Sequence, residues 1–180
     1  MRISFIIFSL FFTGSVLAAE APQAENFTPL FAETCMQHFY SEANVRDPLM
    51  SAHATLLSQA DAAFFLDEFP GKAWGLSIAN IKYVIAFRDD KICTVFAQSA
   101  PVKAVHQNFE TMLNDAPKPL AAKKITNPKY ATNEGAIKTT ALSWSEAGKP
   151  TEILFTLTTS TDSKANIHAM ASMAVVLKPK

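Results

Sequence analysis

The sequence is poor in the residues from which most catalytic and metal sites are built. Its 180 residues include five glycines, two cysteines and four histidines that stand apart from one another. So few glycines leave no phosphate-cradling loop, and unpaired histidines without a C-x-x-C step predict no zinc site. No G-x-S-x-G element is present to activate a serine. The sequence therefore predicts no metal, no cofactor and no catalytic residue.

The chain also lacks an excess of either positive or negative charge. The chain carries 16 basic and 16 acidic residues, which gives a formal net charge of +0. A nucleic-acid-binding or membrane-surface protein normally shows a basic excess gathered on one face. The balance predicts that neither nucleic acid nor anionic lipid is a partner.

The N-terminus has the pattern of a secretory signal. Met1 and Arg2 form a short positive start, an uncharged apolar run follows from Ile3 to Val16, and the small residue Ala18 suits cleavage. The run is too short for a permanent span, which needs about 20 apolar residues, and no later run is longer. We therefore predict a signal peptide over 1–18 and a mature domain over 19–180, periplasmic or secreted. No lipidated cysteine stands at the cleavage site.

The two cysteines, Cys35 and Cys93, predict a disulfide, since an even pair in an oxidising compartment is usually bridged. In the chain-entropy view a loop of this length would stabilise the fold by about 4 kcal/mol. The alternative is two free thiols. A bridge would remove both from the set of possible nucleophiles.

Hydrophobic spacing predicts three helices. The first covers about 29–42, with Phe31, Cys35 and Phe39 on one stripe. The second begins at Asp47-Pro48, a suitable cap, and carries a stripe to Phe64 before the Pro-Gly turn. The third follows Pro101 and contains the most regular amphipathic pattern, over 102–113.

Alternation predicts the strands. In the segment 81–88, Ile81, Tyr83, Ile85 and Phe87 share one face. In the next predicted strand Cys93, Val95 and Ala97 lie on one face, and Ile92, Thr94 and Phe96 lie on the other. The predicted strands are 74–78, 81–88, 92–98, 136–144, 152–159 and 167–177. Residues 115–134, rich in Pro and Lys, are predicted as a mobile loop, and no internal repeat is evident. The order predicts an α+β domain with an antiparallel sheet of five to six strands and helices packed on one face.

The segment 64–75 gathers aromatic residues around a turn. If exposed, Phe65, Phe69 and Trp74 would form an aromatic anchor for a ligand or partner. The alternative is that Phe64, Phe65 and Trp74 close the core, as large aromatic residues usually do.

The mature chain up to the third helix resembles a family of small proteobacterial periplasmic proteins and lipoproteins. The resemblance rests on Thr34-Cys35-Met36, on the turn from Phe69 to Gly75, on Cys93-Thr94-Val95, and on a helix with Phe109 at its centre. It implies export and paired cysteines, and it implies no activity.

These observations predict an exported, non-catalytic binding protein. Its target would be a protein partner or a small apolar ligand, in an inhibitor, immunity or secreted-effector role. The alternative is an exported hydrolase whose site is assembled from dispersed residues, such as His106 or His168 with a serine and an acidic group.

Overall fold

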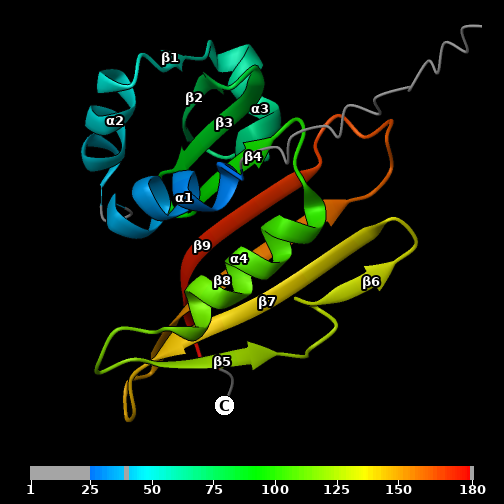
Figure 1. The fold of residues 1–180 in the computed structure, drawn as a ribbon. Coiled ribbons are helices and arrows are strands. Elements are labelled where there is room, and N and C mark those ends of the chain that lie inside the picture. The colour runs from blue at the N-terminus through cyan, green and yellow to red at the C-terminus, as the bar shows by residue number, and fades with distance from the viewer. Residues whose placement is uncertain (1–24, 39–40, 179–180) are drawn as a thin grey trace, which may run out of the picture.

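Nine antiparallel strands form one sheet in the computed structural model, which describes residues 25–38 and 41–178; the predicted signal at 1–18 lies outside these residues. The order across the sheet is β1-β2-β3-β4-β9-β8-β7-β5, and β6 pairs with the same strand β7 as β5 does (Figure 1). The strands are β1 (Thr55–Leu56), β2 (Gly71–Ile78), β3 (Ile81–Arg88), β4 (Cys93–Ala97), β5 (Ala121–Ile125), β6 (Thr132–Glu134), β7 (Ile137–Ser145), β8 (Thr151–Ser160) and β9 (Ala169–Leu177).

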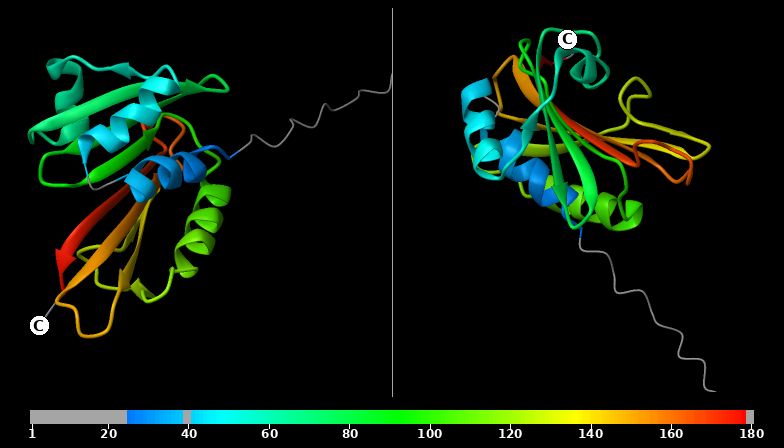
Figure 2. Two further views of the ribbon diagram at one scale, coloured as in Figure 1. Left: turned by 90° about the vertical axis from the view of Figure 1, so that its left-hand side faces the viewer. Right: turned by 90° about the horizontal axis from the view of Figure 1, so that it is seen from above.

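Helices lie on both faces of the sheet. They are α1 (Phe27–Phe31), its continuation as a π-helical turn η1 (Ala32–Met36), α2 (Glu42–Ser51), α3 (Gln59–Leu66) and α4 (Val102–Asn114). Helices α1, η1, α2 and α4 cover one face of the sheet, and α3 alone covers part of the other face (Figure 2, left). None of the helices in the described part of the chain is long and apolar enough to cross a bilayer.

The sheet is built from two arms, and each arm ends in three strands that pair consecutively, β2–β3–β4 in the first and β7–β8–β9 in the second. In the first arm α1, η1, α2, β1 and α3 precede these strands, and in the second arm α4, β5 and β6 precede them. The last strands of the arms, β4 and β9, pair with each other through the register Val95↔Ala171. Within each arm, a short connection joins each of the three strands to the next. Strands joined in this way can pair only antiparallel.

The main core lies between the sheet and α1, η1, α2 and α4. The face predicted for β3 is confirmed, since Tyr83, Ile85 and Phe87 are buried there. Phe31 of α1 and Phe109 of α4 meet over this face with their ring centroids 5.8 Å apart. The amphipathic stripe predicted over 102–113 therefore packs α4 of the second arm against α1 of the first, in addition to the pairing of β4 with β9.

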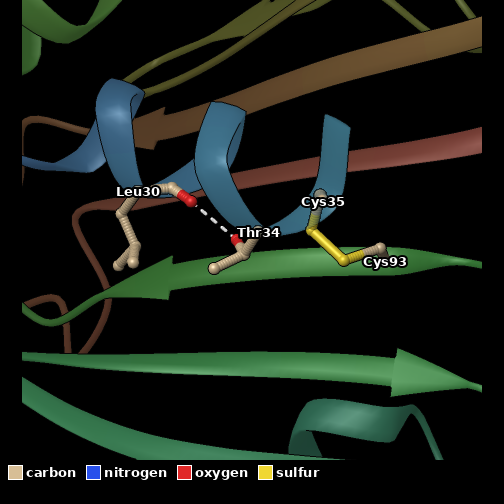
Figure 3. The surroundings of a disulfide bond; sticks show 4 residues. All are labelled: Leu30, Thr34, Cys35 and Cys93. Carbon is tan, nitrogen blue, oxygen red and sulfur yellow. Dashed lines mark hydrogen bonds between the residues drawn. A yellow bond between two sulfur atoms is a disulfide. The ribbon is translucent and has the colours of Figure 1, made fainter. Parts of the chain in front are cut away.

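The predicted disulfide is confirmed. Cys35 of η1 is bonded to Cys93 of β4, and both residues are fully buried (Figure 3). The preceding residue, Thr34, donates its hydroxyl hydrogen to the carbonyl oxygen of Leu30, one turn earlier, at 2.6 Å, which satisfies a buried polar group within the helix. The bridge fixes the N-terminal helix to the centre of the sheet.

Several details of the predicted fold are wrong. The sheet has nine strands, not five to six, and α3 lies on the face opposite the other helices. The single helix predicted from Asp47 to Phe64 is two helices separated by β1, because Ser41 and Ser58 each accept a backbone hydrogen bond and cap a new helix.

The segment 115–134, predicted as a loop, contains β5 and β6. Its β5 sequence, Ala-Ala-Lys-Lys-Ile, shows no alternation of apolar and polar residues. An edge strand such as β5 is held by backbone hydrogen bonds to its neighbour, and its side chains need not follow an alternating pattern. The sequence signal for β5 was therefore absent.

Candidate functional site

The sheet face opposite the main core is only partly covered. Helix α3 packs there against β2 and β3, where Ala62 and Leu66 meet Ala73 and Ala86. Farther along the same face, cross-strand partners form a row that runs over β3, β4, β9, β8 and β7: Val84, Phe96, Met170, Thr158 and Thr139. Viewed from above, the strands of the second arm extend away from α3 (Figure 2, right).

A hollow of about 610 Å³ lies over part of this row, at Phe96, Met170 and Thr158. It is walled by α3 on one side and by the β8–β9 connection on the other. A second hollow, of about 190 Å³, shares Phe65, Phe96 and Ile167 with the first. We call the two together the Phe65 groove. Its lining residues are Phe64, Phe65, Asp67, Lys82, Val84, Arg88, Ile92, Thr94, Phe96, Gln98, Ile137, Thr158, Thr159, Ser160, Ala165, Asn166, Ile167, Met170 and Ser172.

Three aromatic rings form a ladder at the wall of the groove. Phe64 and Phe65 meet nearly edge to face, with centroids 5.2 Å apart. Phe65 then meets Phe96 of β4 at 5.1 Å, again edge to face. Phe65 and Phe96 are thereby held in place, whereas Phe64 is 70% exposed. An aromatic side chain this exposed beside a hollow is the strongest sign of a binding surface in the described residues.

The end of α3 explains why Phe64 points outward. The helix begins at Ser58, whose hydroxyl oxygen accepts the backbone hydrogen of Asp61 at 3.2 Å. It ends at Asp67, which takes a left-handed conformation with φ of 53°. Within so short a helix Ala62 and Leu66, four residues apart, occupy the buried stripe. Phe64 therefore lies off the stripe, which contradicts its predicted place among buried residues.

Two hydroxyl-bearing residues of the groove floor, Thr158 and Ser172, are each hydrogen-bonded to a hydroxyl group on the neighbouring strand. Thr156 and Ser172 share a hydrogen bond of 2.7 Å between their hydroxyl oxygens, and Thr139 and Thr158 share one of 2.9 Å. Because each pair already shares one hydrogen bond, these hydroxyl groups lose fewer bonds to water than unpaired hydroxyl groups would when an apolar molecule covers them. The floor can therefore accept apolar contact at low cost.

Three charged residues lie at one end of the groove, where Arg88 is paired with two carboxylates. Arg88 donates to both carboxylate oxygens of Asp90, and its Nη1 lies 4.0 Å from the carboxylate of Asp67. The same guanidinium stands over the ring of Phe69, 3.6 Å from its centroid. This cluster fixes Phe69 beside the groove by a cation–π contact.

The three residues predicted as an aromatic anchor do not form one surface. Phe65 lines the groove, and Phe69 lies beside it under Arg88, 48% exposed. Trp74 is 1% exposed and belongs to the main core on the other side of the sheet. Phe64 and Ile137 were not predicted as site residues, although both are exposed groove residues. Their exposure depends on where two distant segments meet, which the sequence does not display.

Comparison with protein-family models, curated proteins and solved structures found no match to this chain. The resemblance noted above therefore stays a prediction.

The side chains considered for catalysis are placed apart. Of the described residues, no three His, Cys, Asp or Glu side chains are grouped so as to hold a metal ion. His106 of α4 shares a hydrogen bond of 2.8 Å between its Nε2 and the Thr159 hydroxyl oxygen. Thr159 borders the Phe65 groove but is 2% exposed, and its hydroxyl group contacts His106 on the side of the sheet that α4 covers. His168 lies just before β9, where its backbone bonds with Ala97 and Ser160.

Two groups have shifted pKa values, and both shifts have structural causes. Burial, with the positive charges of Lys138 and Lys124, lowers the pKa of His106, and Glu110 opposes this in part. Burial, with the nearby negative charge of Glu25, raises the pKa of Tyr83. Neither residue lines the Phe65 groove. Burial is the largest cause of both shifts.

Proposed function

We propose that this protein is an exported, non-catalytic binding protein, and that the Phe65 groove binds an apolar ligand. The observation that carries the proposal is the pair of exposed apolar residues, Phe64 and Ile137, that flank a hollow of about 610 Å³. Ligand pockets commonly measure about 300–1,000 Å³ and are lined mainly by apolar and aromatic side chains. The groove matches both features.

A ligand that enters the hollow is favoured over a protein partner on a flat surface. Phe65 and Phe96 stand inside the wall of a concavity, and Phe64 lies at its edge. A flat protein interface would instead present such anchors at the centre of a broad exposed patch. Inhibitor, immunity or effector roles would follow only from the identity of the ligand.

No observation favours the alternative of an exported hydrolase. A hydrolase needs a nucleophile and a base that both reach the substrate. The disulfide occupies both cysteines, and the hydroxyl group that His106 contacts is buried.

Export to the periplasm or beyond is supported by the signal pattern at 1–18 and by the disulfide, which forms and persists in oxidising compartments. Intact mass spectrometry of the protein recovered from the producing cells tests this proposal. The expected N-terminus is Ala19 or Glu20, with a mass two hydrogens below that of the dithiol form. A chain that retains residues 1–18, or that carries two thiols, would contradict export.

The groove is tested with Nile red, an apolar dye whose fluorescence rises when it leaves water. We expect the mature protein to bind the dye, and Phe64→Ala together with Ile137→Ser to weaken binding at least about tenfold, which is about 1.4 kcal/mol. Both residues are exposed, so these changes should leave the fold intact.

The matched control is Met50→Ala, which removes an exposed apolar side chain from α2 on the other side of the sheet. Its dye affinity should equal that of the parent protein. Equal dye affinity in the parent and in the Phe64→Ala, Ile137→Ser variant would overturn the assignment of the groove.

A further inference from the structure

The Phe65 groove has an uncompensated positive charge at one end. Arg88, at the other end, is paired with Asp90 and Asp67. Lys82 of β3 lines the smaller hollow, and no carboxylate of the described residues lies within 4.0 Å of its ammonium group. An apolar groove that carries one free cation favours a ligand with a single negative charge.

Lys82 is accompanied by two neutral hydrogen-bond donors. Gln98 follows β4, and its backbone nitrogen donates to the carbonyl oxygen of Lys82 at 3.0 Å, so the two residues are neighbours. Asn166 comes from the β8–β9 connection and lines the same hollow. All three side chains are exposed, and none has a side-chain hydrogen bond among the described residues. They can therefore turn toward a charged group held at the groove's end.

The apolar part of the groove continues directly from this polar end. Phe65, Phe96 and Ile167 belong to both hollows, so a chain that starts beside Lys82 passes over these residues into the larger hollow. There Met170 and Ile137 continue the apolar lining toward β7. The path thus begins beside Lys82 and continues over apolar side chains, whereas the charges of Arg88 and Asp67 at the other end of the groove are paired.

We propose that the Phe65 groove binds a free straight-chain fatty acid, with its carboxylate at Lys82, Gln98 and Asn166 and its chain along Phe65 and Phe96. This rests on the proposed function of the groove, and it adds the class of ligand and its orientation. The carboxylate end stays in water, where the donors are exposed, and the chain replaces water over the paired hydroxyl groups of the floor. Such a division matches the amphipathic character of the ligand.

The sheet sets the length of the chain. From β3 to β7 the path crosses β4, β9 and β8, and strands about 4.8 Å apart make this about 19 Å. Because each C–C bond is about 1.5 Å long and a straight chain zigzags, this span holds roughly 12 to 16 carbons. A branched or two-chain lipid would need more width than one hollow of about 610 Å³ offers.

One acidic residue stands near the polar end. Asp61, with His53, lines an adjoining hollow of about 800 Å³ that also contains Lys82. The Asp61 carboxylate accepts the hydroxyl hydrogen of Ser58 at 2.6 Å, which uses part of its capacity at the start of α3. Asp61 does not line the smaller hollow, where Lys82, Gln98 and Asn166 meet.

The test is displacement of Nile red from the mature protein by decanoate, dodecanoate and tetradecanoate, below their micelle concentrations, beside the alcohols of equal length. Affinity should rise roughly tenfold for each two added methylene groups, since each buried methylene contributes about 0.8 kcal/mol. Each carboxylate should bind about two- to fivefold more tightly than its alcohol, as expected for an exposed ion pair. The difference should shrink in high salt.

Lys82→Met keeps the apolar stem of the side chain and removes its charge. It should abolish the preference for carboxylates and leave the affinity for alcohols unchanged. The matched control, Lys149→Met, changes an exposed lysine in the β7–β8 turn, away from the groove, and should retain the preference.

The outcomes separate the two proposals. Equal affinity for carboxylates and alcohols, with Lys82→Met silent, overturns the fatty-acid assignment and leaves the groove as an apolar site. Failure of every straight chain to displace a dye that still responds to Phe64→Ala does the same. If the dye does not respond to Phe64→Ala, the groove itself is not the site.

Discussion

The ring of Phe65, on α3, stands edge to face against the ring of Phe96, on β4, with the two centroids 5.1 Å apart. This contact joins the helix on the open sheet face to the central strand pair. It also places Phe65 in the wall that the two hollows of the groove share. Phe65 therefore contributes both to the packing of α3 and to the wall of the groove.

Phe65→Ala should lower the free energy of unfolding by about 1–3 kcal/mol, below the range for a fully buried Phe because the side chain is half-buried. Urea titration followed by circular dichroism measures it. The neighbouring change Phe64→Ala is the control and should stay within about 0.5 kcal/mol, since that ring is exposed. An equal loss in both variants would mean that the ring contact with Phe96 is not what holds α3.

Replacing both cysteines, Cys35→Ala with Cys93→Ala, should lower the free energy of unfolding by about 2–4 kcal/mol. Alanine is chosen because both positions are fully buried and a serine hydroxyl there would need a partner. The measurement is urea unfolding of the parent protein, the variant and the reduced parent protein. Reduction should destabilise the parent and leave the variant unchanged; a loss in the reduced variant would show that the effect is not that of the bridge.

Trp144→Phe should cost about 1–3 kcal/mol of stability. The indole nitrogen of Trp144 donates to the carbonyl oxygen of Leu113 at 2.6 Å, near the end of α4, and phenylalanine would leave that buried acceptor without a partner. The ring contact with Phe155, at 4.8 Å, should survive in part. Thermal unfolding is the measurement. An unchanged melting temperature would show that water replaces the lost donor without penalty.

Acid should destabilise the protein through His106. Its pKa is lowered in the folded state from the ordinary value of 6.5, so the unfolded chain binds the proton more readily. This contribution to stability is complete above pH 6.5 and is lost as the pH falls from there toward the lowered folded pKa. Nδ1 is buried without a hydrogen-bond partner among the described residues, and Nε2 is held by Thr159, so the imidazolium gains no compensating bond.

His106→Gln keeps a polar group near Thr159 and removes the titration. Between neutral pH and the lowered pKa, the variant should lose less stability on acidification than the parent protein, as measured by urea unfolding at each pH. His53→Gln changes an exposed histidine and serves as the control, with the parent's pH profile. Identical slopes in the parent and in His106→Gln would exclude His106 as the source.

Local pattern was enough to identify much of the fold. Alternation placed β3 at 81–88 with the correct buried face, and it assigned Thr94 and Phe96 to the opposite face of β4, which is the face of the groove. The spacing over 102–113 identified α4. These elements bury one face against the core, and burial imposes a period that the residues display directly.

Elements that depend on contact with a distant segment could not be predicted from the sequence. Strand β5 exists because its backbone pairs with β7, and its residues show no period. Helix α3 is so short that its buried stripe reduces to Ala62 and Leu66, and such a stripe does not indicate which face of the sheet the helix covers. The pairing of β4 with β9, which joins the two arms, brings together segments more than 70 residues apart and has no local signal.

By itself the sequence determined the signal pattern, the pairing of Cys35 with Cys93 and the aromatic character of the segment that contains Phe65. Each depends on residue type and compartment, and those are local facts. Only the tertiary structure decided that Trp74 lies in the core and Phe64 at the surface, and that Phe65 meets Phe96 beside Lys82. A groove between distant strands arises from how the sheet is ordered and covered, and no stretch of the chain contains that information alone.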